Sequence, residues 1–497
     1  MRPDQPLILA LDQGTSSSRA LLFGADGTLQ AQHGEAFALD YPQPGWVQVD
    51  ARVLWDTQRR AIAGVLARAS VAPAQIAAVG LSNQRETVLA WDADSGQPLT
   101  PAIIWQCRRT TADCATLRER GLEAALRART GLLADPYFSA TKMAWLLRQV
   151  PGLRERARQG RLRFGTVDSW LVWQLSGGAA HLTDASNASR TLLCNLDHGD
   201  WDPWLLELFD IPASSLPRIV DSSGVVAHTD PGMFGARVPI AGIAGDQQAA
   251  LFGQACFQPG MAKNTYGTGC FLLLNSGATR PHPQAGLLGT IAWRLGGRLT
   301  YALEGAAFVA GALIQWLRDG LGLLADAAES ETLAREVDDS GGVVVVPALA
   351  GLGAPHWRPE ARGLICGLTR GSTRAHIARA ALEAVALQNH DLLAAMTAAG
   401  LALTTLRIDG GMSANNLLCQ IQADVLGIPV QRTAQRECSA YGAALLAGLG
   451  IGLWRDLTEV ATLWRAEQDF HPVLDTARRA ALLAQWQQAL RRTLLEA

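Results

Sequence analysis

Two segments of the chain have the same layout, and they constrain the fold more than any other feature. Residues 7–24, "LILALDQGTSSSRALLFG", and residues 260–275, "GMAKNTYGTGCFLLLN", each consist of an apolar run, a turn containing Gly and Thr, and a second apolar run. Such a pattern is typical of a β-hairpin, because glycine allows the tight turn. Helical patterns separate the predicted strands, as at 52–69 and 374–396. Alternating strands and helices predict an α/β fold.

The repeated hairpin also predicts how the 497 residues divide. A chain of this length is expected to form two or more domains, since one domain usually has about 100–200 residues. We therefore predict two similarly built domains, residues 1–253 and 254–497, with a cleft between them. The similarity between the two halves is too weak to indicate a duplicated sequence.

Composition excludes several classes of function. A formal net charge of −2 provides no field that would favour nucleic acid. The chain has no apolar run of about 18 residues, so we expect no membrane span, and its first residues do not resemble a signal peptide. None of the eight cysteines forms a Cys-x-x-Cys pair, which favours free thiols in a reducing compartment and therefore the cytoplasm. Only two of the 43 basic residues are lysines, Lys142 and Lys263.

Three turns could hold the phosphates or the nucleoside of a nucleotide, although no Gly-x4-Gly-Lys-Ser/Thr loop is present. They are "DQGTSSSR" (12–19), "TYGTGC" (265–270) and "DGGMSANN" (409–416). Backbone N–H groups, hydroxyl groups and the start of a helix bind anions well. Each turn alone is more often structural. Together, two hairpin turns and a Gly-Gly turn predict the arrangement of the actin-like ATPases, in which two domains enclose ATP.

A second group of residues could bind a neutral polyhydroxylated ligand. Arg85 and Glu86 follow a buried-looking strand and offer a donor and an acceptor, which suits hydroxyl groups that both donate and accept. Trp105 and Tyr137 could cover the C–H face of such a ligand. The alternatives are a surface ion pair for the charged residues and ordinary core positions for the aromatic ones.

Asp246 lies in the apolar run "GIAGDQQAALFGQ". A carboxylate can accept the proton of a hydroxyl group that attacks a phosphoryl group, which would make Asp246 a general base. The alternative is an aspartate that caps the helix beginning at this point.

The chain resembles the FGGY carbohydrate kinases, and within that family its members that phosphorylate glycerol. Collinear motifs across nearly the whole chain carry the resemblance, among them "LDQGTSSSRA", "SNQRET", "IIWQCRRT", "YFSATKMAWLLRQ", "GIAGDQQAALFGQ", "KNTYGTGCF" and "DGGMSANN". The resemblance implies two actin-like (ribonuclease H-like) domains and in-line transfer of the γ-phosphoryl group of ATP, with Mg²⁺, to glycerol. The product would be sn-glycerol 3-phosphate, formed in glycerol catabolism, and we expect the enzyme to be a homodimer or homotetramer.

The same resemblance implies a role for each residue that matches a family motif. Asp246 would be the general base, and Asp12 would lie near Mg²⁺, with water between them. The glycerol site would consist of Arg85, Glu86, Trp105, Tyr137, Asp246, Gln247 and Phe271. The nucleotide would contact Thr15, Ser16, Ser17, Arg19, Thr268, Gly311, Gln315, Gly411 and Asn415.

Two other functions remain open from the sequence. A kinase of a larger polyol or a ketose would need smaller side chains than Trp105 and Phe271 around its substrate. A non-enzymatic actin-like ATP-binding protein would leave the adjacent Arg85 and Glu86 without a role.

Overall fold

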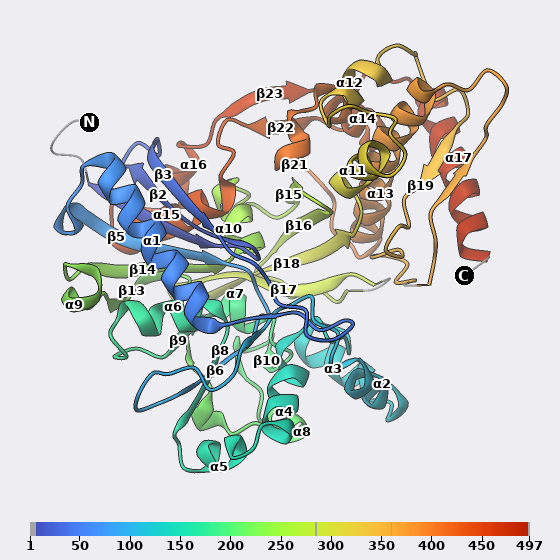
Figure 1. The fold of residues 1–497 in the computed structure, drawn as a ribbon. Helices are drawn as coiled ribbons and strands as arrows, with labels where there is room; N and C mark the ends of the chain where they lie inside the picture. The colour runs from blue at the N-terminus through green and yellow to red at the C-terminus, as the bar shows by residue number, and fades with distance from the viewer. Residues whose placement is uncertain (1–5, 284–285, 359, 496–497) are drawn as a thin grey trace.

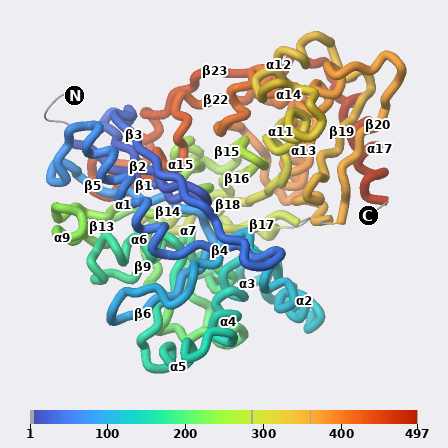
Figure 2. Tube along the Cα trace, viewed as in Figure 1, coloured from blue at the N-terminus to red at the C-terminus, as the bar shows by residue number. Residues whose placement is uncertain are grey.

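The computed structural model describes residues 6–283, 286–358 and 360–495. Two large mixed sheets, of six and seven strands, form the centre of the fold, and helices cover them. Figure 1 shows the first sheet in blue and green and the second in yellow-green to red, and Figure 2 traces the chain between them. The α/β fold predicted from the sequence is confirmed.

The first sheet places the ends of three parallel strands next to one another. Its strands are, in spatial order, β13 (Ser223–His228), β14 (Pro239–Gly245), β5 (Ile76–Asn83), β1 (Leu7–Gln13), β2 (Ser17–Gly24) and β3 (Leu29–Ala36). The predicted first hairpin is β1 and β2, which pair antiparallel. Strands β1, β5 and β14 are parallel, with Asp12 opposite Ser82 and Gly245 opposite Asn83. The residues that follow these strands therefore meet at one edge of the sheet.

The second sheet contains the other two predicted turns. Its strands are, in spatial order, β17 (Leu288–Leu295), β18 (Arg298–Ala307), β16 (Cys270–Gly277), β15 (Met261–Tyr266), β21 (Thr405–Asp409), β22 (Val430–Thr433) and β23 (Ala466–Phe470). The predicted second hairpin is β15 and β16. Strand β15 also runs parallel to β21, with Thr265 opposite Asp409, so the turns that follow the two strands are neighbours.

Two helices join the sheets. Helix α10 (Asp246–Gly253) leads from β14 in the first sheet towards β15 in the second. Helix α15 (Cys438–Gly450) comes from the last part of the chain, yet it packs against α10 and against β1, β5 and β14 (Figure 1). The two helices can approach closely because each has a glycine, without a side chain, where they touch. A Cβ at Gly253 would lie 2.3 Å from the carbonyl oxygen of Cys438, and one at Gly442 would lie 1.8 Å from that of Ala249.

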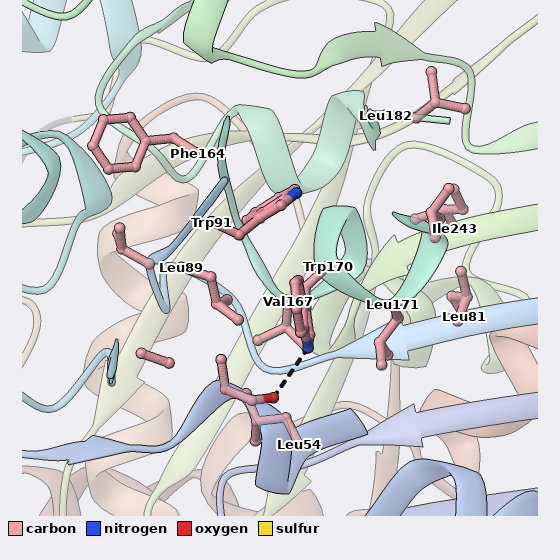
Figure 3. Packing of buried hydrophobic residues seen from close by; sticks show 14 of the residues in the cluster. Leu54, Leu81, Leu89, Trp91, Phe164, Val167, Trp170, Leu171, Leu182 and Ile243 are labelled. Carbon is pink, nitrogen blue, oxygen red and sulfur yellow. Dashed lines mark hydrogen bonds between the residues drawn. The ribbon is translucent and has the colours of Figure 1, made fainter. Parts of the chain in front are cut away.

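The core below the first sheet fixes the segment that follows β5. Figure 3 shows Trp91 and Trp170 among leucine, isoleucine and valine side chains. The two indole rings meet edge to face with centroids 5.4 Å apart, and Nε1 of Trp170 donates to the carbonyl oxygen of Ala51 at 3.1 Å. Both Leu81 and Leu89 are buried in this core, so the polar residues between them are anchored at both ends.

The two helices predicted at 52–69 and 374–396 are present as α1 (Ala51–Ala69) and α13 (Arg374–Ala398). Two further long helices are α14 (Asn416–Leu426) and α17 (Thr476–Leu495). A short buried strand, β19 (Val344–Val346), pairs with β20 (Leu364–Cys366) outside the large sheets. All eight cysteines are free thiols. Among the described residues, no helix combines the length and apolar character needed to cross a bilayer.

The remaining elements lie mostly between β3 and β14. They are β4 (Gln48–Val49), β6 (Leu89–Asp92), β7 (Ala102–Ile103), α2 (Thr111–Glu119), α3 (Glu123–Thr130), α4 (Ser139–Gln149), α5 (Leu153–Arg158), β8 (Leu162–Gly165), α6 (Val167–Leu175), β9 (Leu182–Asp184), α7 (Ala185–Ala188), β10 (Cys194–Asn195), β11 (Asp200–Trp201), α8 (Pro203–Phe209), β12 (Arg218–Val220) and α9 (Pro231–Phe234), with α11 (Gly311–Asp319), α12 (Glu329–Ala334) and α16 (Leu457–Ala461) further along.

Candidate active site

Asp246 is the first residue of α10, directly after β14. Gly245 is the N-cap residue of this helix, so the alternative interpretation of Asp246 as the capping residue is wrong. One carboxylate oxygen, Oδ1, accepts from the backbone N–H of Gln247 at 2.8 Å and lies 3.4 Å from Nε of Arg85. The Asp246 side chain is 31 % exposed, which leaves part of the carboxylate open to a ligand.

The electrostatic surroundings of Asp246 favour a proton acceptor. Burial raises the pKa of Asp246 above its ordinary value, while the positive charges of Arg85 and Lys263 lower it. A carboxylate with a raised pKa binds a proton more readily than a fully solvated one.

Arg85 and Glu86 are not a surface pair. Together with Arg190 and Glu304 they form a ring of four alternating charges, which we call the charge ring, and none of the four residues is more than 3 % exposed. Its ion pairs are Arg85–Glu304 at 2.5 Å, Arg190–Glu304 at 3.1 Å, Arg190–Glu86 at 2.8 Å and Arg85–Glu86 at 3.7 Å. Two arginines and two glutamates make the ring neutral, and buried charges require such pairing.

The backbone of Glu86 is held in an unusual conformation. Its φ is +62°, a left-handed value that a residue with a long side chain rarely adopts. The carbonyl oxygen of Glu86 accepts from the hydroxyl group of Ser139 at 3.0 Å and from Nζ of Lys142 at 3.5 Å. Backbone strain of this kind occurs often at functional sites, where surrounding contacts enforce it.

The two aromatic residues predicted for the ligand site, Trp105 and Tyr137, lie next to each other, and Tyr137 also lies next to Arg85. Nη2 of Arg85 donates to the hydroxyl group of Tyr137 at 3.3 Å. The rings of Tyr137 and Trp105 meet edge to face with centroids 5.5 Å apart, and Nε1 of Trp105 donates to the hydroxyl group of Thr15 at 3.0 Å. Trp105 and Tyr137 therefore connect the polar cluster with the first hairpin turn.

The second sheet contributes charged side chains to the same candidate site. Lys263 on β15 is fully buried, and its Nζ donates to Oε1 of Gln247 and, at 2.9 Å, to the hydroxyl group of Thr265. Phe271 lies opposite Thr265 in the β15–β16 pair and opposite Ala306 in the β16–β18 pair. Directly opposed residues share one face of a sheet. Phe271 therefore shares the face that carries Lys263 and Glu304.

The first hairpin turn contains Thr15 and Ser16, and Ser17 begins β2. Arg19 on β2 bridges the two halves of the molecule, since it pairs with Asp12 at 2.5 Å and also with Glu437, next to the start of α15. Asp12 is buried at the end of β1. Arg19 and Asp12 are thus neighbours at the edge of the first sheet.

The second and third turns meet at the start of α11. Thr268 is exposed, and its carbonyl oxygen accepts from the backbone N–H groups of Ala310 and Ala312. Gly311 opens α11, and a Cβ there would lie 2.7 Å from the carbonyl oxygen of Gly267 and 3.5 Å from the sulfur of Met412. Gln315, on the next turn of this helix, is exposed.

The third turn combines a left-handed glycine with a capped helix. Gly410 has a φ of +89°, and Gly411 follows it at the surface. The side chain of Asn415 accepts from the backbone N–H of Leu418 at 2.9 Å and so caps α14. A cavity of about 380 Å³ opens beside Gly410 and Gly411, and Arg19 also lines it.

Comparison with known proteins agrees with this geometry. Residues 7–253 match the N-terminal domain of the FGGY family of carbohydrate kinases, and residues 262–451 match its C-terminal domain. The chain belongs to the FGGY family of carbohydrate kinases.

Similar FGGY proteins include two curated glycerol kinases. The one from Trichlorobacter lovleyi is 57 % identical over 98 % of both chains, and the one from Aromatoleum aromaticum is 58 % identical over 98 % of both. Among solved structures, Plasmodium falciparum glycerol kinase with ADP is similar with a TM-score of 0.93 and 33 % identity, over 99 % of this chain and 98 % of the other. The predicted two-domain, actin-like ATPase fold is confirmed, and membership of this kinase family implies the use of ATP.

Four residues that face this FGGY site were not predicted as ligand-binding residues. They are Arg190, Gln248, Lys263 and Glu304. A signal existed for two of them, because Lys263 is one of only two lysines and Glu304 is a lone acidic residue in the apolar run "YALEGAA". The same kind of signal identified Asp246.

Gly411→Ala tests whether the third turn of this FGGY kinase lies against the nucleotide. Among the described residues, none places an atom within 4 Å of a Cβ at Gly411, whose φ is an ordinary one. We therefore expect an unchanged melting temperature, and a KM for ATP raised about tenfold because the methyl group would occupy space that the nucleotide needs. Thermal unfolding and steady-state kinetics measure the two quantities.

Gly371→Ala is the matched control. Gly371 also has an ordinary φ and lies on an exposed turn, with the nearest atom 3.8 Å from a Cβ. A KM for ATP that is unchanged in Gly411→Ala would contradict the predicted contact.

Proposed function

We propose that the protein transfers the γ-phosphoryl group of ATP to a terminal hydroxyl group of glycerol, giving sn-glycerol 3-phosphate and ADP. The observation that carries the proposal is the position of Asp246 beside Arg85, at the ends of the neighbouring strands β14 and β5. The names of the similar curated proteins support glycerol as the acceptor.

Hydroxyl groups of glycerol would be held by residues that already lie together. Arg85 and Glu86 offer a donor and an acceptor, Tyr137 lies within 3.3 Å of Arg85, and Gln247 adjoins Asp246. Trp105 and Phe271 would pack against the carbon atoms. This mixture of a few polar groups and aromatic walls is typical of small-molecule sites.

In the reaction, Asp246 accepts the proton of the attacking hydroxyl group. The oxygen of glycerol forms a bond to the γ-phosphorus atom of ATP, and the bond from that phosphorus to the β,γ-bridging oxygen breaks, so ADP leaves. The proton remains on Asp246 until it is lost to solvent. Because its carboxylate is held by Arg85 and the N–H of Gln247, the proton acceptor is in place before the substrate binds.

The nucleotide would lie between the turns of the two sheets. We assign the phosphates to Thr15, Ser16, Ser17, Arg19 and Thr268, whose hydroxyl, guanidinium and backbone groups donate hydrogen bonds. We assign the nucleoside to Gly311, Gln315, Gly411 and Asn415, around the start of α11 and the third turn.

The site fits Mg²⁺ bound with the phosphates rather than by the protein alone. The described part of the chain has no cluster of three or more His, Cys, Asp or Glu side chains that could hold a metal ion. Mg²⁺ commonly uses one or two carboxylates, several waters and substrate phosphates. Buried Asp12, paired with Arg19, is the carboxylate that we assign to such a site through water. Bound Mg²⁺ would neutralise charge on the phosphates.

We also propose three features that the sequence predicts. They are the division into domains at residues 253 and 254, assembly as a dimer or tetramer, and a cytoplasmic location. The free state of all eight cysteines supports a reducing compartment.

A panel of acceptors tests the function directly. With ATP and Mg²⁺, we expect ADP release to depend on glycerol, to need Mg²⁺ and to be much slower with xylulose or gluconate. Release of ADP without any acceptor, at an undiminished rate, would favour an actin-like ATPase. A preference for a ketose would favour the other kinase alternative.

Asp246→Asn tests the general base. We expect kcat to fall at least about a hundredfold, the usual contribution of such a group, with a nearly unchanged affinity for glycerol. Isothermal titration with glycerol and steady-state kinetics separate binding from turnover.

Asp230→Asn is the matched control for this change. Asp230 is the N-cap residue of helix α9, where its side chain accepts from the backbone N–H of Gly232 at 2.8 Å. Asparagine caps helices about as well, so the control should retain full activity. Near-normal turnover of Asp246→Asn would exclude Asp246 as the base.

Lys263→Met tests the electrostatic control of the base. The charge of Lys263 lowers the pKa of Asp246, so removing it raises that pKa. A base is active when deprotonated, and the acidic limb of the kcat–pH profile should therefore move to higher pH. Lys263→Arg keeps the charge and should leave the limb in place. An acidic limb at the same pH in Lys263→Met and the wild type would contradict the prediction.

A further inference from the structure

The charge ring joins the two sheets at the glycerol site. Arg85 and Glu86 follow β5 of the first sheet, Arg190 lies just after α7, and Glu304 comes from β18 of the second sheet. Glu304 is the ring's contribution from the second half of the chain. Burial opposes its ionisation, but Arg190 and Arg85 together lower the pKa of Glu304 to about 2, so it is charged.

The contact between Glu304 and Arg85 determines the direction of the guanidinium group. Oε2 of Glu304 accepts from Nη1 at 2.5 Å and Oε1 accepts from Nη2 at 3.0 Å, a forked pair of hydrogen bonds. Forked pairs fix the plane of a guanidinium group as well as its position. The N–H groups outside the fork then point to the proposed site, the second N–H of Nη2 towards Tyr137 and that of Nε towards Asp246.

We propose that Glu304 is a positioning residue for the acceptor substrate, because it holds Arg85 in the orientation in which Arg85 meets the hydroxyl groups. Glu304 itself does not touch the substrate. The inference rests on the proposed function, since it concerns the binding of glycerol at that same site. It also makes glycerol affinity depend on contact between the two sheets, because Arg85 and Glu304 come from different ones.

The principal test is Glu304→Gln. Glutamine has nearly the same shape, but its NH₂ group cannot accept a hydrogen bond from Arg85. One of the two hydrogen bonds between residue 304 and Arg85 is therefore lost. We expect the KM for glycerol to rise about tenfold or more, because a hydrogen bond from a charged group is lost or misdirected. We expect kcat to change less than about threefold and the KM for ATP to remain the same.

A second variant separates positioning from charge balance. Glu304→Gln alone leaves an excess positive charge in a buried site, which lowers stability. The double variant Glu304→Gln with Arg190→Gln is neutral again, so we expect its melting temperature to recover in part while the KM for glycerol stays raised. Arg190 also holds Glu86, so the double variant is compared with Arg190→Gln alone. If Glu304 only balanced charge, the KM of the double variant for glycerol would be no higher than that of Arg190→Gln.

Glu383→Gln is the matched control for a buried glutamate. Glu383 on α13 is 5 % exposed and pairs with Arg379 at 2.9 Å. We expect a lower melting temperature with an unchanged KM for glycerol.

The outcomes also distinguish this inference from the proposed function. If the wild-type protein does not phosphorylate glycerol, the proposed function fails. If the wild type is active and Glu304→Gln has a normal KM for glycerol, only the role of Glu304 is overturned. Should the single variant not fold, the neutral double variant gives the same decision.

Discussion

The close packing of α10 against α15 is the constraint on which the rest of this structure depends. Helix α10 carries the chain from the first sheet to the second, and α15 fixes it from the opposite end of the sequence. The hydroxyl group of Ser439 on α15 also donates to the carbonyl oxygen of Asp246 at 3.1 Å. Side chains at Gly253 or Gly442 would clash with the facing backbone and push the helices apart.

The site combines two electrostatic environments within a short distance. The charge ring is buried and neutral, and its members orient one another while their mutual pairing offsets the cost of desolvating the charges. Asp246 lies at its border, with a carboxylate that is partly exposed and paired with a single arginine. A structural charge is thus enclosed, while the charge proposed to exchange a proton remains accessible. In other functional sites too, neighbouring ionisable groups of the same kind have different roles because their surroundings differ.

Residues of the candidate site stand out in the sequence mainly where they interrupt local patterns. Asp246 stood out because it is acidic in an apolar run, and Arg85 and Glu86 because they follow a buried strand. The parallel pairing of β5 with β14 then explains why these separate segments meet. Arg190 carried no such signal, because its importance comes from two glutamates that are 104 and 114 residues away along the chain. Partners at such separations are not encoded by local periodicity.

The sequence by itself determined the two hairpins, the alternation of strands and helices, and the residue types available for holding ATP and a small polyol. These depend on interactions within a few residues, namely side-chain periodicity and the conformational freedom of glycine. Only the tertiary structure decided that Asp246 is no helix cap, that Arg85 is buried in a four-membered ring and that α15 belongs against the first sheet. The physical reason is that burial and charge pairing are properties of groups brought together in space, so residues far apart in the chain determine them jointly.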